Sequence, residues 1–560
     1  MTKSSVMTIL SRAHTIARMS IQTGIPSDEL LGIVKEAKAR KFQNPCSCLL
    51  KGGLDLAQKF KVSLLSKGGE RTMAQTTPVL IVGAGIAGLT AAYRLTQAGV
   101  PVNVIEASNR VGGRIRTRQK ALGTPFAVEL GGEFIYAEHI YLRSLIEELG
   151  LHLVDLHAVD ENLETQETYF FGGRKVSLAE ITTDFAPIAE QINRDFEAIA
   201  NFKDYTTKIP AAVELDNISI AEYLDQIPQT TPAIRELVKA AYETYYGLNM
   251  EEQSSLNLIY IIGAQLGKFG IIGVTEQLFY VQGGNELIPQ KLANLISNSI
   301  ETGTILEAIN YLSDGRYRVV LRSENSTFER TYERILLTLP LTLLRQVQLN
   351  VDLPPLKKLS IDTASYGTNS KLTTTYQEKI WRTRYNSTAN VYLDLGFQST
   401  WETAESRYHP GMGLITQFVG GTEGLAIGAG SPEIHAQKLN SQLEQVFPGI
   451  SNISMPDRTI RSYWPEEVYA RGSYLCYKPG EWTKFYGVER QRVGNIFFAG
   501  EHTSFLENQG YMEGGCQTGE IAAMEILQDL GLKGIALCAG NRQPTPRPSP
   551  SQEGNKKPII

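Results

Sequence analysis

The sequence contains few cysteines, and their spacing does not fit a metal site. The 560 residues include five cysteines, Cys46, Cys48, Cys476, Cys516 and Cys538, without the paired spacing of a zinc-binding module. Cys46 and Cys48 lie too close together along the chain for an unstrained disulfide. We therefore expect free thiols, a reducing compartment and no metal.

Long apolar runs and an excess of charge of one sign are also absent. No stretch reaches the roughly 18 consecutive apolar residues that a membrane-spanning helix requires. The 54 lysines and arginines nearly balance 59 aspartates and glutamates, which gives a formal net charge of −5. This balance argues against a general affinity for nucleic acid or for acidic membranes.

Both ends of the sequence differ in composition from the part between them. Residues 1–75 form a basic extension in which a capped helix is predicted from Ser27 toward Arg40. The first part of this extension has basic but no acidic side chains, which leaves a transit-like targeting segment open. Otherwise we expect a cytoplasmic protein, with Met73 as an alternative start. Residues 536–560 are rich in proline and polar residues and are predicted to be disordered.

The part between these ends begins with the pattern of a parallel βαβ unit. An apolar run at 79–82 ends in glycines, residues 89–98 have helical spacing, and residues 102–105 form a second apolar strand. Further strands are predicted at 317–321, 335–339, 371–376 and 414–419. We predict an α/β fold divided into a first nucleotide-binding part (76–150), a mainly helical substrate-covering insertion (151–300), mixed strands of both domains (301–460) and a last nucleotide-binding part (461–535).

Gly83, Gly85 and Gly88 form a G-x-G-x-x-G fingerprint between the first strand and the helix. The first glycine permits the tight turn, the second lets a pyrophosphate approach the backbone, and the third allows close packing of helix and strand. Glu106 closes the second strand, where a carboxylate accepts hydrogen bonds from ribose hydroxyls. With Ala87 in the same turn, these residues predict a dinucleotide whose phosphates face a helix N-terminus.

Three segments resemble the flavin-containing amine oxidase family, which includes the monoamine oxidases. Residues 106–114 are similar to the signature E-A-x-x-R-x-G-G-R, residues 497–501 to F-A-G-E and residues 510–514 to G-Y-M-E-G. The resemblance runs from about Val79 to Leu527. It implies FAD as the cofactor, on a Rossmann-like scaffold of two dinucleotide-binding domains with an inserted α+β substrate domain. It also implies cofactor contacts at Ala107, Arg110, Gly113, Arg114, Ile309, Trp464, Gly500, Glu501, Tyr511 and Met512.

The same resemblance implies how the reacting pocket is built. Ser473 stands where some members carry a cysteine linked covalently to FAD, so we expect non-covalent FAD. Tyr474 and Tyr511 match a pair of parallel aromatic rings that hold the amine over the flavin. Lys371 is similar to the family lysine that reaches a water beside flavin N5, where oxygen reacts.

The expected activity is that of an FAD-dependent amine oxidase. The resemblance implies hydride transfer from the α-carbon of a primary or secondary amine to the flavin, hydrolysis of the imine, and reoxidation by O2 to give H2O2. Phe134 stands where related L-amino-acid oxidases have an arginine for the substrate carboxylate, although Arg143 or Arg471 could supply such a contact. Glu133 could bind a distant substrate ammonium or be held by hydrogen bonds of the scaffold.

Other assignments stay open at this point. An L-amino-acid oxidase or dehydrogenase, and a desaturase, would use the same fold, because fold alone does not fix the chemistry. A flavin-binding interaction protein belongs to a different class, and the combination of Lys371, Tyr474 and Tyr511 argues against it. A homodimer is also left open.

Overall fold

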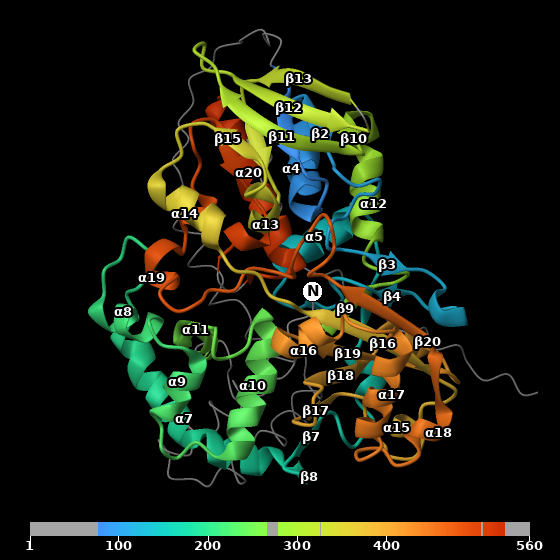
Figure 1. The fold of residues 1–560 in the computed structure, drawn as a ribbon. Coiled ribbons are helices and arrows are strands. Elements are labelled where there is room, and N and C mark those ends of the chain that lie inside the picture. Colours follow the sequence, from blue (N-terminus) through green and yellow to red (C-terminus); the bar gives the residue numbers. More distant parts are fainter. Residues whose placement is uncertain (1–76, 266–277, 325, 506–507, 533–560) are drawn as a thin grey trace, which may run out of the picture.

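Two halves make up the computed structural model, which describes residues 77–265, 278–324, 326–505 and 508–532 (Figure 1). The first half is built on a five-stranded sheet, and the second combines a seven-stranded sheet with a group of helices. The predictions for residues 1–75 and 536–560 lie outside the described residues.

The five-stranded sheet of the first half is parallel throughout. Its strands, in spatial order, are β10 (Ile300–Glu301), β2 (Val102–Ile105), β1 (Val79–Val82), β14 (Ile335–Leu337) and β21 (Ile496–Phe498). All four residues of β1 are buried, as expected for a parallel strand that is covered on both faces. The predicted βαβ unit is confirmed, with its helix α4 at Ile86–Gln97.

Helix α4 packs against α20 (Met512–Asp529), which comes from the other end of the chain (Figure 1). The two helices approach so closely that Gly519 has no room for a side chain. A Cβ atom at this position would lie 2.4 Å from the carbonyl oxygen of Ala87. The same half contains α5 (Ile140–Glu148), α12 (Leu287–Leu295), α13 (Leu341–Leu344) and α14 (Pro355–Thr363).

A second, four-stranded sheet extends this half at the top of Figure 1. Its order is β13 (Ser326–Tyr332), β12 (Tyr317–Ser323), β11 (Thr304–Tyr311) and β15 (Gln348–Asn350). The strand predicted at 317–321 is therefore β12, and the strand predicted at 335–339 is β14.

The seven-stranded sheet of the second half is mixed. Its order is β20 (Ser454–Tyr463), β16 (Ser370–Tyr376), β19 (Gly413–Val419), β18 (Ser399–Glu402), β17 (Val391–Leu393), β7 (Thr168–Phe171) and β8 (Arg174–Val176). The strands predicted at 371–376 and 414–419 are β16 and β19, which pair antiparallel. Helices α15 (Ile380–Thr383), α16 (Gly421–Ala426), α17 (Pro432–Leu443) and α18 (Ile450–Ile453) lie beside this sheet (Figure 1).

The helical group lies next to that sheet and consists of α7 (Leu178–Ala198), α8 (Pro210–Asp216), α9 (Ile220–Asp225), α10 (Pro232–Tyr246) and α11 (Ser255–Gln265). Capping boxes start α7 at Ser177 and α9 at Ser219. The helices predicted within 151–300 are confirmed, but the range is less helical than expected. It also contains the strands β6 (Leu153–Asp155), β7, β8 and β9 (Leu278–Val281).

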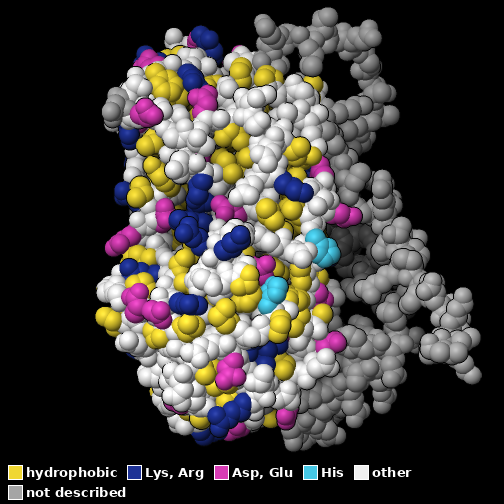
Figure 2. All heavy atoms as spheres, turned by 90° about the vertical axis from the view of Figure 1, so that its right-hand side faces the viewer, with side chains coloured by type: hydrophobic (Ala, Val, Ile, Leu, Met, Phe, Trp, Pro, Cys, Tyr) yellow, Lys and Arg dark blue, Asp and Glu magenta, His cyan; other side chains and the backbone are white. Residues whose placement is uncertain are grey.

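The remaining elements are short. They are β3 (Thr117–Arg118), β4 (Val128–Glu129), β5 (Ile135–Tyr136), α6 (His157–Asp160) and α19 (Trp482–Phe485). On the face that includes β3, β4 and β20, hydrophobic side chains are dispersed among charges of both signs, with a group of basic side chains near its middle (Figure 2). Among the described residues, no helix combines the length and apolar character needed to cross a membrane.

Candidate active site

A cavity of about 900 Å³ lies along the carboxyl ends of the parallel strands β1, β2, β14 and β21. This edge of a parallel sheet is where α/β proteins bind nucleotides. The predicted cofactor residues that line it are Gly83, Gly85, Ala87, Glu106, Ala107, Arg110, Gly113, Arg114, Trp464, Gly500, Glu501, Tyr511 and Met512. The cavity therefore brings together segments from both ends of the described chain.

The three glycines of the fingerprint occupy the positions that their predicted roles require. Gly83 has a φ of 105°, which side chains rarely permit. A Cβ atom at Gly85 would have no neighbour within 4 Å in this structure, so this position faces open cavity. A Cβ atom at Gly88 would lie 2.0 Å from the carbonyl oxygen of Gly83, and Gly88 serves packing rather than the cavity wall.

The first turn of α4 is suited to an anion. No side chain caps its N-terminus, and no acidic residue lies in its first turn. The unpaired N–H groups and the helix dipole therefore favour negative charge at this point of the cavity.

Glu106 is held in place at the end of β2. Its Oε2 accepts a hydrogen bond from the amide of Ala84 at 2.8 Å, and its Oε1 accepts from the amide and hydroxyl of Ser108 at 2.9 and 2.8 Å. A carboxylate has further lone pairs, so Glu106 can still accept hydrogen bonds from a ribose in the cavity. Together with the open position at Gly85 and the uncapped helix, it fits the dinucleotide part of a flavin cofactor.

The two signature arginines are already engaged within the protein. Arg110 donates to the carbonyl oxygens of Val111, Gly113 and Ile115, and so holds its own loop. Nη1 of Arg114 donates to the carbonyl oxygen of Ser473 at 2.7 Å and to Glu501 at 2.8 Å. The expected contact of these arginines with the cofactor phosphates is thus accompanied by a structural role that the motif did not predict.

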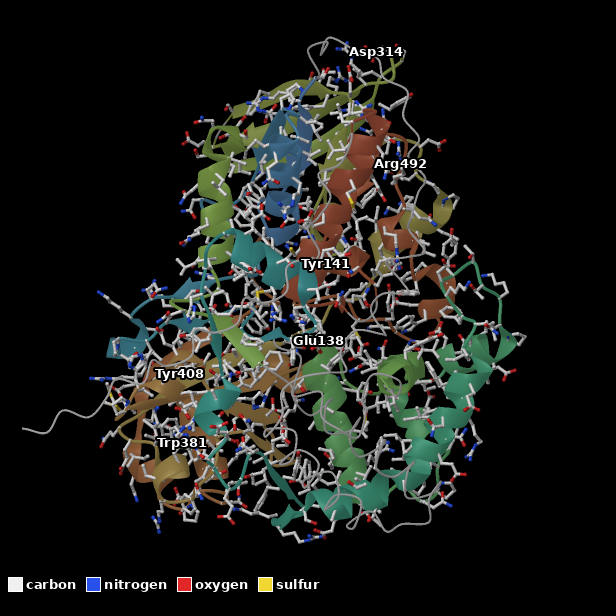
Figure 3. The ribbon with its side chains drawn as sticks, turned by 180° about the vertical axis from the view of Figure 1, so that it is seen from behind. Glu138, Tyr141, Asp314, Trp381, Tyr408 and Arg492 are labelled. Carbon is white, nitrogen blue, oxygen red and sulfur yellow. The ribbon has the colours of Figure 1, made fainter. Side chains whose placement is uncertain are left out.

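Helix α20 begins at the cavity with Met512, and no side chain caps it. Glu513, in its first turn, turns away and accepts hydrogen bonds from the amides of Tyr141 and Leu142 at 3.0 and 2.7 Å. Burial raises the pKa of Glu513 to about 7. Figure 3 shows Tyr141 beside the start of α20, at the level where the two halves meet.

Ile309 is not on the cavity wall. It is fully buried in β11, whereas Ala308 lines the cavity together with residues 304–307. The register of β11 shifts between Leu306 and Ala308, which changes the side-chain alternation at this point. The resemblance gave Ile309 as a cofactor contact but did not reveal this irregularity.

Lys371 lies on β16 and points into the protein, with 3% of its surface exposed. Its Nζ donates to Glu133 at 2.9 Å and to the carbonyl oxygens of Glu129 and Gly131 at 3.1 and 2.8 Å. These three acceptors match the three N–H groups of an ammonium. The alternative of an outward, solvated lysine is therefore excluded.

Glu133 is fully buried, and both its oxygens have partners. Oε2 accepts from Lys371, and Oε1 accepts from the amide of Ala404 at 3.2 Å. Its predicted role in binding a substrate ammonium is not supported, because the Lys371 ammonium already takes this place. The neighbouring Phe134 is buried against Trp401, with ring centroids 5.4 Å apart.

Tyr245 lies near both residues of the predicted aromatic pair. Tyr511 lines the cavity, whereas Tyr474 is fully buried and donates from its hydroxyl to the carbonyl oxygen of Thr244 at 3.0 Å. Burial raises the pKa of each hydroxyl well above its usual value, and the nearby Tyr245 raises both further. Tyr245 was not among the candidates predicted from the sequence, although two adjacent tyrosines, Tyr245 and Tyr246, end α10.

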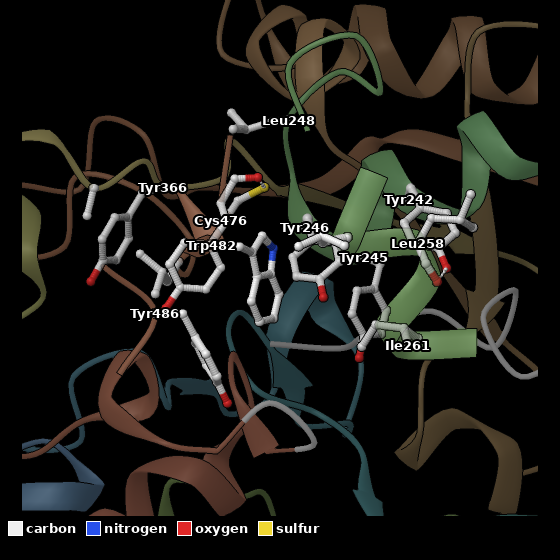
Figure 4. Close-up of a cluster of buried hydrophobic side chains, with 14 of the residues drawn as sticks. Tyr242, Tyr245, Tyr246, Leu248, Leu258, Ile261, Tyr366, Cys476, Trp482 and Tyr486 are labelled. Atoms are coloured by element: carbon white, nitrogen blue, oxygen red, sulfur yellow. Dashed lines mark hydrogen bonds between the residues drawn. The ribbon is translucent and has the colours of Figure 1, made fainter. Parts of the chain in front are cut away.

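Tyr245 belongs to a larger cluster of buried aromatic side chains (Figure 4). The rings of Tyr245 and Tyr246 lie 4.7 Å apart, and Trp482 lies 4.7 Å from the ring of Tyr486. In this close-up the cluster continues from α10 across to the segment that contains Cys476. The cluster ties the helical group to the C-terminal segment that carries Tyr474.

Ser473 is fully buried, and its hydroxyl donates to Oδ1 of Asn369 at 2.6 Å. In the part of the chain that the structure describes, Cys476 and Cys516 are buried free thiols. The described ranges also contain no group of three or more side chains that could hold a metal ion.

The sequence matches the family described as flavin containing amine oxidoreductase over residues 86–527. Flavin-containing amine oxidase B of Homo sapiens is 26% identical over 474 residues, covering 82% of this chain and 88% of the relative. An L-amino-acid oxidase of Vipera ammodytes ammodytes is 24% identical over 484 residues, covering 82% and 95%. The resemblance noted from the sequence is thereby confirmed.

Solved structures support the fold. Cyclohexylamine oxidase from Brevibacterium oxydans IH-35A matches with a TM-score of 0.69 at 22% identity, over 81% of this chain and 100% of that one. Putrescine oxidase bound to putrescine matches with a TM-score of 0.68 at 20% identity, over 81% and 99%. These similarities confirm the predicted Rossmann-like fold with a substrate domain.

Proposed function

This chain belongs to the family of flavin-containing amine oxidoreductases, and we propose that it is an FAD-dependent amine oxidase. The reaction converts a primary or secondary amine, O2 and water into a carbonyl compound, ammonia or a smaller amine, and H2O2. The observation that carries the proposal is the cavity at the strand ends, which gathers the fingerprint turn, Glu106 and the start of α20.

Non-covalent FAD is the cofactor that this cavity fits. The Gly83–Gly88 turn and the start of α4 would hold the diphosphate, and Glu106 the ribose. Ser473, with its hydroxyl bonded to Asn369, has no sulfur for a covalent link. When bound, the flavin supplies the acceptor for the hydride that leaves the α-carbon of the amine.

The aromatic residues would position the amine. Tyr511 on the cavity wall and the fully buried Tyr474 would contribute the aromatic rings, and their raised pKa values keep both phenols neutral at physiological pH. Positioning at near-attack distance and exclusion of water are the contributions that such groups make to the rate. We propose Tyr245 as a third residue of this wall, and Lys371 as a group that supports the reaction with oxygen.

An amine with a single amino group suits this site better than a diamine. The carboxylate of Glu133 is neutralised by Lys371, so it does not offer a charge to a second ammonium. An L-amino-acid oxidase is the second candidate. Against it, Phe134 provides no guanidinium, and Arg143 donates to the carbonyl oxygen of Ala137 and lies over the ring of Phe279.

Anaerobic mixing tests the proposal directly. The purified protein is mixed with monoamines, diamines, L-amino acids and a porphyrinogen, and bleaching of the flavin absorbance identifies the donor. Fast bleaching by monoamines supports the proposal. Bleaching by L-amino acids alone would establish the second candidate, and bleaching by the porphyrinogen alone would make the protein a desaturase.

A further inference from the structure

We propose that Arg471 is a further cofactor-binding residue, whose guanidinium contacts the diphosphate of FAD. The inference rests on the proposed cofactor. It concerns a residue outside the fingerprint turn and outside the signature at 106–114, and it depends on three independent features of Arg471.

The first feature is its place on the cavity wall, in a segment that is firmly held. The amide of Arg471 donates to the carbonyl oxygen of Glu467 at 2.9 Å. The preceding carbonyl oxygen, that of Ala470, accepts from the hydroxyl of Thr342 at 2.7 Å. Thr342 lies in α13, directly after β14, so the segment is anchored above the carboxyl end of this strand.

That anchor lies next to the fingerprint turn. Thr338, the residue that follows β14, donates from its hydroxyl to the carbonyl oxygen of Val82 at 2.8 Å. Thr338 Oγ1 would also lie 2.6 Å from a Cβ atom at Gly83. Arg471 is therefore attached to the same strand edge as the turn that faces the cofactor phosphates.

The second feature is that the guanidinium of Arg471 has no partner within the described residues, unlike those of the other arginines on the cavity wall. These are Arg110, Arg114 and Arg322. Arg110 and Arg114 are engaged as described above, and Arg322 donates to Glu307 at 2.5 Å. Within the described ranges, the Arg471 side chain has no hydrogen bond, ion pair or ring contact, and it is exposed. A guanidinium with uncommitted donors beside a nucleotide cavity is suited to a phosphate.

The third feature is the backbone of Arg471, whose φ of 50° lies in the left-handed region. Five non-glycine residues of the described chain have positive φ, and Arg471 is the one among them that lines the cavity. This conformation is strained for a residue with a side chain. Such strain is found preferentially at ligand sites, and a glycine would avoid it.

The diphosphate is a better partner for Arg471 than a substrate carboxylate. Arg471 is exposed, whereas Ser473 and Tyr474, two and three positions further on, are fully buried. The chain thus runs from the outer wall of the cavity toward the aromatic residues, and Arg471 stays on the outer side. A diphosphate held by the fingerprint turn would place two negative charges near the same strand edge.

The test measures dissociation constants of the apoprotein for FAD and for riboflavin, which lacks phosphate, by quenching of flavin fluorescence. Arg471→Asn and Arg471→Gly both remove the charge and place a residue that tolerates positive φ at this position. Arg471→Lys keeps the charge. Arg194→Asn on the exposed face of α7 is the control. We expect the first two to weaken FAD binding roughly 10-fold or more, with riboflavin binding unchanged and a smaller loss for Arg471→Lys.

Two results would overturn the assignment. Equal weakening of FAD and riboflavin would indicate a general effect on the cavity, and unchanged FAD binding with a raised KM for substrates that carry a carboxylate would make Arg471 a substrate contact. A different result would show that FAD is not the cofactor. In that case the wild-type protein itself would not bind FAD more tightly than riboflavin, whatever residue stands at position 471.

Discussion

Replacing Lys371 with methionine probes both the stability of the fold and the oxygen reaction. In the native protein Lys371 and Glu133 form an ion pair at 2.9 Å, and the two side chains are 3% and 0% exposed. After Lys371→Met, the Glu133 carboxylate stays buried with one remaining donor, the amide of Ala404. Leaving one partner of a buried pair unpaired costs about 3–5 kcal/mol, so we expect a loss of that size in the free energy of unfolding.

A double variant shows how much of the stability loss comes from leaving the Glu133 charge without its partner. In Lys371→Met/Glu133→Leu both charges are gone, and buried pairs replaced by apolar side chains of similar volume are often nearly neutral. The carbonyl oxygens of Glu129 and Gly131 still lose their donor, which retains part of the cost. We therefore expect the double variant to be more stable than Lys371→Met by about 2 kcal/mol or more in urea unfolding.

The same two variants test the role of Lys371 with oxygen. If its charge supports that step, both variants reoxidise more slowly in stopped-flow experiments, whereas anaerobic reduction by the amine changes little. Normal reoxidation in both variants would show that Lys371 has a structural role only. A single variant as stable as the wild type would refute the energetic reasoning from the ion pair.

Three further predictions concern the cavity and its surroundings. Gly88→Ala should prevent folding, because its methyl group would meet the Gly83 carbonyl oxygen at 2.0 Å. Gly85→Ala should fold but bind FAD at least roughly 10-fold more weakly. Thermal unfolding and FAD titration distinguish the two variants. Burial raises the pKa of Glu129 to about 8 from 4.5, so the folded state keeps this proton up to about pH 8, and stability falls as the pH rises from about 4.5 to about 8. Glu129→Gln should accordingly exceed the wild type in stability at pH 9 but not at pH 4, and equal shifts at both values would contradict this. Denaturation should release FAD into the supernatant, because the buried Ser473 hydroxyl forms no covalent link; yellow precipitate would show the reverse.

Local patterns predicted the nucleotide-binding half well. The run at 79–82, the glycine spacing and the acid at Glu106 each depend on residues that are near one another in sequence, and all appear in the structure as expected. Strands β12, β16 and β19 were also found from their composition, because alternating or continuous apolar residues mark a strand wherever it pairs. The order of the strands in each sheet was beyond this information.

Contacts between distant parts of the chain explain what sequence analysis missed. Lys371 and Glu133 are 238 positions apart, and Arg114 and Glu501 are 387 apart. Each of these residues was recognised separately as a candidate, but nothing local indicates that they neutralise one another. Ile309 was predicted to contact the cofactor, but Ala308 is the residue that lines the cavity. This difference has a similar origin, since the register shift in β11 depends on its pairing with β12.

The pairing of Lys371 with Glu133 has a consequence for substrate charge. A free Glu133 would have favoured a second ammonium on the substrate, but the ion pair removes that attraction. Tyr474 and Tyr511 add no charge, because burial raises the pKa of both hydroxyls well above the physiological range. An amine that arrives protonated must then lose its proton or remain unpaired in an apolar site, which is unfavourable by several kcal/mol. If the proposed function is correct, we therefore expect the site to favour the neutral amine, which is also the form whose nitrogen lone pair can assist departure of the hydride.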